Sequence, residues 1–210
     1  MANLLYIIAT PNSEEESSSR KIGDSFVRKY KKEHPNDIVD TIDLFSDSLQ
    51  LIDGKYVTAR TKLYSGKPER LTKEESLSVE GVASVVDNFM KYDKYVIASP
   101  MWNFGVPYIL KRYIDSIVIT GKTFKYTDKG PVGLLSGKKL LHIQSSGGIY
   151  SHGDFSKYDF SSTYIKSILG FIGITDITTL FIEGVDILPE KKPLIISAAL
   201  EKAERLAESF

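Results

Sequence analysis

The stretch Leu4-Leu5-Tyr6-Ile7-Ile8-Ala9, which Thr10-Pro11-Asn12 follows, decides the fold class of this chain. A short apolar run without alternation is typical of a strand buried on both faces, and proline with asparagine ends it with turn chemistry. Strands of this kind occur in parallel sheets that carry helices on both faces. The chain is therefore expected to begin with a strand of a parallel α/β sheet.

Helical and strand patterns alternate along the rest of the chain. Ile22, Phe26 and Tyr30 recur at the spacing of one helix face, so a helix is expected there. Another helix is expected to start at the capping box Thr72-Lys73-Glu74-Glu75. Further strands are expected at 38–44, 95–99, 139–145 and 177–182, and further helices at 109–119, 162–170 and 191–208.

This alternation predicts one domain over residues 1–210, a three-layer α/β/α sandwich on a five-stranded parallel sheet of order 2-1-3-4-5. Residues 45–70 show no clear period, and an excursion with short helical turns is expected there.

The composition excludes several classes of function. Lysine plus arginine and aspartate plus glutamate each total 27, so the chain lacks the basic excess of a protein that neutralises nucleic-acid phosphates. Cysteine is absent, which excludes disulfides, thiol nucleophiles and cysteine-ligated metals. The apolar run at 4–9 is too short to span a membrane and passes into the acidic residues 14–16. A cytoplasmic protein without nucleic-acid or membrane partners is expected.

Three loops of unusual composition follow predicted strands, at 10–19, 100–107 and 145–153. In an open parallel sheet, ligands bind at the carboxyl ends of the strands, where the strand order reverses. With the order 2-1-3-4-5, these loops line one crevice. The functional site is therefore expected there.

The first loop ends in Ser17, Ser18 and Ser19 directly before a helix. Hydroxyls and unpaired amides at a helix N-terminus bind anions, so this cluster favours a phosphate site. The alternative is that one serine merely caps the helix. The neighbouring acidic residues 14–16 would repel an anion unless they point into solvent.

The second and third loops offer complementary surfaces. The second supplies an aromatic platform with polar edges, from Pro100, Met101, Trp102, Asn103 and Phe104. The third supplies backbone amides that small side chains leave accessible, at Ser145, Ser146, Gly147 and Gly148, with Tyr150 beyond them. A phosphate site, a ring platform and an amide wall in one crevice match the parts of flavin mononucleotide (FMN).

Other chemistries fit less well. The segment 133–139 resembles a phosphate loop but is one residue short between its glycines and lacks the final hydroxyl residue. No metal site is predicted, because cysteine is absent and the histidines are dispersed, with His152 the one tempting ligand. Asp115 is expected to cap or pair on its helix rather than to act as a general base. No protein side chain is predicted as catalytic, because a bound flavin would carry the chemistry. A single-electron carrier and a non-catalytic flavin-binding module stay open as alternatives, although the balanced charge weighs against a charged docking face.

The motifs also carry a family resemblance. Pro100-Met101-Trp102-Asn103-Phe104 is followed in order by 110–115, 121–127, 130–134, Gly137-Lys138-Lys139, Ser145-Ser146-Gly147-Gly148 and 169–174. This ordered set, which covers nearly the whole chain, resembles the FMN-dependent NADH-azoreductases, a branch of the flavodoxin-like quinone reductases.

The resemblance implies a homodimer with one FMN per subunit, in which NADH reduces the flavin and the flavin then reduces a quinone or an aromatic azo compound. It places a first-loop hydroxyl at Thr10, the phosphate site at Ser17 to Ser19, the ring contact at Met101 to Phe104 and the amide wall at Ser145 to Gly148. It puts Phe124 and Tyr126 near the partner subunit's substrate pocket. Two positions depart from the family pattern: Ser146 replaces a frequent arginine, and Tyr150 a frequent histidine.

Overall fold

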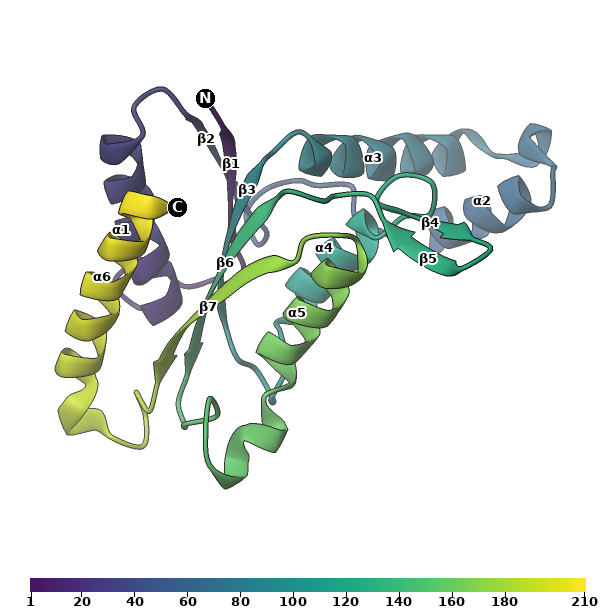
Figure 1. Ribbon diagram of the computed structural model, residues 1–210. Helices are drawn as coiled ribbons and strands as arrows, with labels where there is room; N and C mark the ends of the chain where they lie inside the picture. The colour runs from purple at the N-terminus through teal and green to yellow at the C-terminus, as the bar shows by residue number, and fades with distance from the viewer.

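The computed structural model describes residues 1–210 and has a central five-stranded parallel sheet (Figure 1). Its strands are β1 (Asn3–Ile8), β2 (Ile38–Asp43), β3 (Lys94–Pro100), β6 (Lys139–Ser146) and β7 (Asp176–Glu183). They lie in the order β2-β1-β3-β6-β7, and each pairs with its neighbour in parallel. Counted along the chain this is 2-1-3-4-5, so the predicted topology is confirmed.

Helices cover both faces of this sheet. They are α1 (Ser18–Glu33), α2 (Gly54–Tyr64), α3 (Lys73–Met90), α4 (Tyr108–Ile117), α5 (Phe160–Phe171) and α6 (Lys192–Ser209). Figure 1 shows α1 and α6 side by side on one face, with α3, α4 and α5 on the other. The predicted three-layer sandwich is therefore confirmed.

Strand β1 explains this arrangement, because its side chains enter both cores. Leu4, Tyr6 and Ile8 pack with α1 and α6, while Leu5 and Ile7 pack with α3, α4 and α5. All are buried, which removes apolar surface from water on both sides of the sheet. The absence of alternation in the sequence reflects this two-sided burial.

The capping box before α3 is also confirmed. The Glu75 backbone N–H donates to Thr72 Oγ1 over 3.2 Å, and the Thr72 backbone N–H donates to the Glu75 carboxylate over 2.8 Å. Lys62 pairs with Glu75 as well, at 2.7 Å. The contact with the Lys62 ammonium and the hydrogen bond from the Thr72 N–H both stabilise the carboxylate. They hold the pKa of the Glu75 carboxyl below its ordinary value.

Two regions differ from the sequence prediction. Residues 45–70 contain the regular helix α2, which Asp53 caps, rather than short turns alone; only Tyr56 and Ala59 of this helix are buried, so its periodic signal is weak. The strands β4 (Phe124–Thr127) and β5 (Gly130–Gly133) form an unpredicted antiparallel hairpin. Short 3-10 helices occupy Pro68–Arg70, Asp154–Tyr158 and Pro189–Lys191. None of the helices is both long and apolar enough to cross a lipid bilayer.

Candidate functional site

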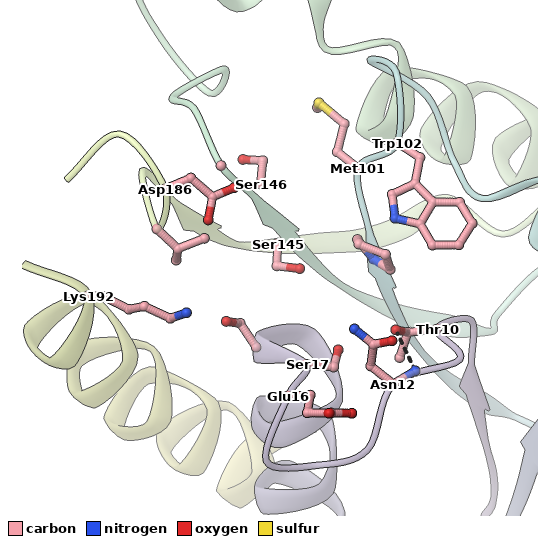
Figure 2. A pocket seen from close by; sticks show the side chains of 14 residues that line it. Thr10, Asn12, Glu16, Ser17, Met101, Trp102, Ser145, Ser146, Asp186 and Lys192 are labelled. Atoms are coloured by element: carbon pink, nitrogen blue, oxygen red, sulfur yellow. Dashed lines mark hydrogen bonds between the residues drawn. The ribbon is translucent and has the colours of Figure 1, made fainter. Parts of the chain in front are cut away.

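A cavity of about 260 Å³ opens at the carboxyl ends of β1, β3 and β6 (Figure 2). Its lining comes from four strand-end loops and the starts of α1 and α6. The lining residues are Thr10, Asn12, Glu16, Ser17, Ser18, Pro100, Met101, Trp102, Ser145, Ser146, Gly147, Val185, Asp186 and Lys192. The three loops singled out from the sequence therefore meet at one cavity, at the predicted reversal of strand order.

The start of α1 forms the hydroxyl-rich side of this cavity. Ser17 is the N-cap, and its Oγ accepts the Arg20 backbone N–H over 3.3 Å. Ser17 and Ser18 line the cavity, whereas Ser19 is fully buried and its Oγ contacts Ser17 Oγ at 3.3 Å. The first-turn amides of a helix have no partner within the helix and attract anions. Ser17 thus fills the capping role and still faces the cavity, so the two interpretations of the serines are compatible.

The acidic residues beside these serines behave differently from one another. Glu14 pairs with Arg28 at 2.9 Å, and Glu15 is exposed. Glu16 lines the cavity, and its carboxylate accepts weak hydrogen bonds from the Ser13 N–H and Oγ over 3.4 and 3.3 Å. One carboxylate of the three therefore adds negative charge to the cavity.

The loop after β3 is a tight turn that presents Met101 and Trp102. Trp102 and Gly105 exchange backbone hydrogen bonds of 2.9 Å, and the Met101 N–H donates to Ser145 O over 2.7 Å. Asn103 and Phe104 adopt φ values of 47° and 66°, a left-handed conformation that is costly for residues with a Cβ. Their side chains do not line the cavity. The Phe104 ring instead stacks on Tyr158 with centroids 5.1 Å apart.

Backbone hydrogen bonds tie the loop after β6 to the loop after β7. Gly147 O accepts the N–H groups of Asp186 and Ile187 over 3.2 Å each, and Gly148 O accepts the N–H of Gly184 over 3.0 Å. A Cβ built on Gly147 would lie 2.3 Å from Asp186 Oδ2. Gly147 is therefore the residue that lets the Asp186 carboxylate approach this loop closely.

Tyr150 lies outside this cavity. Glu183 accepts the Tyr150 N–H over 2.7 Å and the Ser151 N–H over 2.8 Å. The Tyr150 side chain lines a second, mainly apolar cavity of about 350 Å³ together with Gly148, Ile149, Phe155 and Ile187. Ring contact between Tyr150 and a flavin stays a prediction from the resemblance.

The structure thus brings together part of the predicted cofactor site. Of those residues, nine line the cavity: Thr10, Ser17, Ser18, Pro100, Met101, Trp102, Ser145, Ser146 and Gly147. Five do not line it: Ser19, Asn103, Phe104, Gly148 and Tyr150.

Five lining residues went unrecognised in the sequence: Asn12, Glu16, Val185, Asp186 and Lys192. Asn12 and Glu16 belong to the loop at 10–19, whose polar composition already indicated a binding site. Val185 and Asp186 follow the last strand, and the carboxyl ends of parallel strands are where ligands bind in such sheets. Lys192 carries no local pattern, because its position depends on how α6 packs beside α1.

The two predicted substrate-contact residues lie on the β4–β5 hairpin, away from the cavity of their own chain. Tyr126 is 70% exposed, but Phe124 is only 7% exposed and packs on Phe171 with centroids 4.8 Å apart. Phe124 therefore belongs to the core and exposes little of its ring to a partner. Of the two, Tyr126 keeps a ring that a second molecule can contact.

Buried polar side chains of β3, β6 and the start of α5 pair with one another close in sequence to the lining residues Pro100 and Ser145. Ser99 Oγ lies 2.9 Å from His142 Nε2, and Gln144 Nε2 donates to Asp159 Oδ1 over 3.2 Å. Asp159 also caps α5 by accepting the Ser162 N–H over 2.9 Å. Burial lowers the pKa of His142 to about 4. His142 is therefore a neutral structural partner of Ser99 at the end of β3.

Comparisons with known proteins agree with this architecture. A family model described as "Flavodoxin-like fold" matches residues 2–207. The chain is 44% identical to an FMN-dependent NADH:quinone oxidoreductase of Bacillus cereus and to another of Staphylococcus haemolyticus, with 100% of both chains covered in each case. It is 35% identical to an FMN-dependent NADH-azoreductase of Bacillus anthracis solved in complex with FMN. That structure superposes with a TM-score of 0.88 over 99% of this chain and 100% of the other. The chain therefore belongs to the flavodoxin-like family, in the branch whose members are named FMN-dependent NADH:quinone oxidoreductases and azoreductases.

Proposed function

We propose that this chain is an FMN-dependent NADH:quinone oxidoreductase that also cleaves aromatic azo compounds reductively. The observation that carries this proposal is the single cavity in which the start of α1, the Met101–Trp102 turn and the loop at Gly147 meet. Full-length identity of 44% to enzymes of that name supports the same assignment.

The lining residues fit FMN by their chemistry. Ser17, Ser18 and the first amides of α1 offer the donors that a phosphate dianion needs. Met101 and Trp102 offer apolar surface for a flat ring, and Gly147 has no side chain to obstruct a ring edge. Thr10 and Asn12 lie between these ends, where the polar ribityl chain needs hydrogen-bond partners (Figure 2).

When FMN is bound, it supplies the two-electron redox chemistry. Ser17 and Ser18 would hold the cofactor by its phosphate, and Met101 and Trp102 would offer apolar surface to its ring. We assign no protein side chain a chemical step.

Two measurements on the purified protein test this function. The cofactor released on denaturation is expected to be FMN, and NADH consumption is expected to depend on added benzoquinone. Bound FMN without steady-state NADH oxidation would indicate a single-electron carrier or a non-catalytic flavin-binding module. Absence of flavin binding after reconstitution would contradict the site itself.

Ser18 and Ser19 form a matched pair for testing the phosphate site. Ser18→Ala is expected to weaken FMN binding by about tenfold or more, since hydrogen bonds to charged groups contribute about 1.5 to 3 kcal/mol. Ser19→Ala removes a hydroxyl that does not line the cavity and is expected to change FMN binding less. Fluorescence titration of the two apoproteins with FMN compares them. Equal FMN affinity in wild type and both variants would show that neither hydroxyl contributes to phosphate binding.

We further propose that the chain acts as one domain within a cytoplasmic homodimer. The aromatic residues Phe104, Tyr108 and Tyr126 are 42%, 66% and 70% exposed, and an isolated chain would leave their apolar surface in water. Sedimentation at micromolar concentration is expected to give roughly twice the chain mass.

Tyr126→Asp is expected to lower quinone-reductase activity while FMN stays bound, because this ring would complete the partner's pocket. Tyr64→Asp, a change at another exposed tyrosine, serves as its control. A fully active monomer would contradict the dimer.

A further inference from the structure

Lys192 is the only basic residue among those that line the cavity, and two carboxylates, Glu16 and Asp186, line it as well. Figure 2 shows its side chain reaching from the start of α6 into the cavity, across from the serines of α1. Some lysines of the chain pair with acidic partners, as Lys62 does with Glu75 at 2.7 Å. Lys192 has no such ion pair, although acidic side chains line the same cavity.

The position of Lys192 on its helix is unfavourable for a cation. It is the first residue of α6, where the helix dipole favours negative charge. The first turn of α6 contains no acidic residue, and its N-cap Lys191 makes no capping hydrogen bond from its side chain. An unpaired lysine at this end of a helix costs stability unless an anion binds beside it.

In the proposed site, that anion is the phosphate of FMN, which binds at the serine side of the cavity. A phosphate monoester carries about −1.5 to −2 charges at neutral pH, and the two lining carboxylates would repel it. The ammonium of Lys192 would offset this repulsion from the side of the cavity opposite the start of α1. Riboflavin, which has the same ring and ribityl chain without the phosphate, gains nothing from this charge.

We propose that Lys192 is the cationic contact for the phosphate of the flavin and that it makes the site prefer FMN to riboflavin. This inference rests on the proposed FMN site and names the charge that completes it. Because the Lys192 side chain is exposed, salt screens its interaction with the phosphate. The preference for FMN is therefore greatest at low ionic strength.

The test titrates full-length apoprotein with FMN and with riboflavin, following the quenching of flavin fluorescence. Lys192→Gln is expected to weaken FMN binding by about three- to tenfold at low salt, the range between an exposed ion pair and a hydrogen bond to a charged group. Riboflavin binding is expected to stay unchanged. Lys192→Arg is expected to retain the preference, and the loss in Lys192→Gln is expected to shrink at high salt. The matched control is Lys191→Gln, which changes the net charge equally at a lysine that does not line the cavity.

Three results would overturn the proposal: unchanged FMN affinity in Lys192→Gln, an equal loss for FMN and riboflavin, or the same loss in Lys191→Gln. Failure of the site itself is distinguishable, because Ser18→Ala would then also leave FMN binding unchanged. If Ser18→Ala weakens FMN binding and Lys192→Gln does not, the phosphate site stands without the lysine.

Discussion

Gly133→Ala is expected to lower the free energy of unfolding by about 2 to 3 kcal/mol, or the melting temperature by roughly 5 to 10 °C. A Cβ at this position would lie 2.3 Å from the Gly173 N and the Ile172 C, which are backbone atoms and cannot rotate away. The flanking chain cannot shift freely either, because Leu134 N donates to Thr123 O and Leu135 N to Ile172 O, each over 2.9 Å. Thermal and urea unfolding measure the loss.

Gly170→Ala is the control for this substitution. Gly170 lies in α5, where a Cβ would meet nothing within 4 Å, so alanine is expected to raise stability by up to about 1 kcal/mol through its better helix propensity. If Gly133→Ala has the same free energy of unfolding as wild type, then β5 does not pack closely against the turn between α5 and β7. Because the same hairpin carries Tyr126, Gly133→Ala is also expected to weaken the homodimer proposed above.

The second large effect is a loss of stability in mild acid that depends on His142. Burial lowers the pKa of His142 to about 4 from its ordinary value of 6.5, so the unfolded chain binds a proton more readily than the folded chain between these pH values. Its contribution to stability is therefore complete above about pH 6.5 and is lost progressively as the pH falls to about 4. At pH 5 the loss is about 2 kcal/mol, at 1.36 kcal/mol per pH unit.

Urea unfolding at several pH values between 4 and 7.5 tests this dependence. His142→Gln is expected to flatten the profile, since glutamine does not titrate, even if it also lowers stability at pH 7.5 by disturbing Ser99. His152→Gln changes a histidine in the exposed loop and is expected to keep the wild-type slope. A wild-type slope in His142→Gln would show that other groups cause the acid sensitivity.

The sequence by itself determined the order of the sheet and which strand-end loops meet at one cavity. The runs at 4–9 and 95–99 report side chains buried on both faces, and such strands alternating with amphipathic helices allow few arrangements. That arrangement brings the loops after β1, β3 and β6 to one edge. The capping box at Thr72 was readable because all its contacts lie within four neighbouring residues.

Tertiary structure alone decided which side chains of these loops enter the cavity. Gly147 and Asp186 meet through backbone hydrogen bonds between two loops, and such bonds leave no pattern of residue types. Lys192 reaches the cavity only because α6 packs beside α1, far from it in sequence. Phe124 enters the core and Tyr150 turns to a second cavity for the same reason. Periodicity records burial along one element, whereas the direction of a loop side chain depends on neighbours that the chain meets only once it has folded.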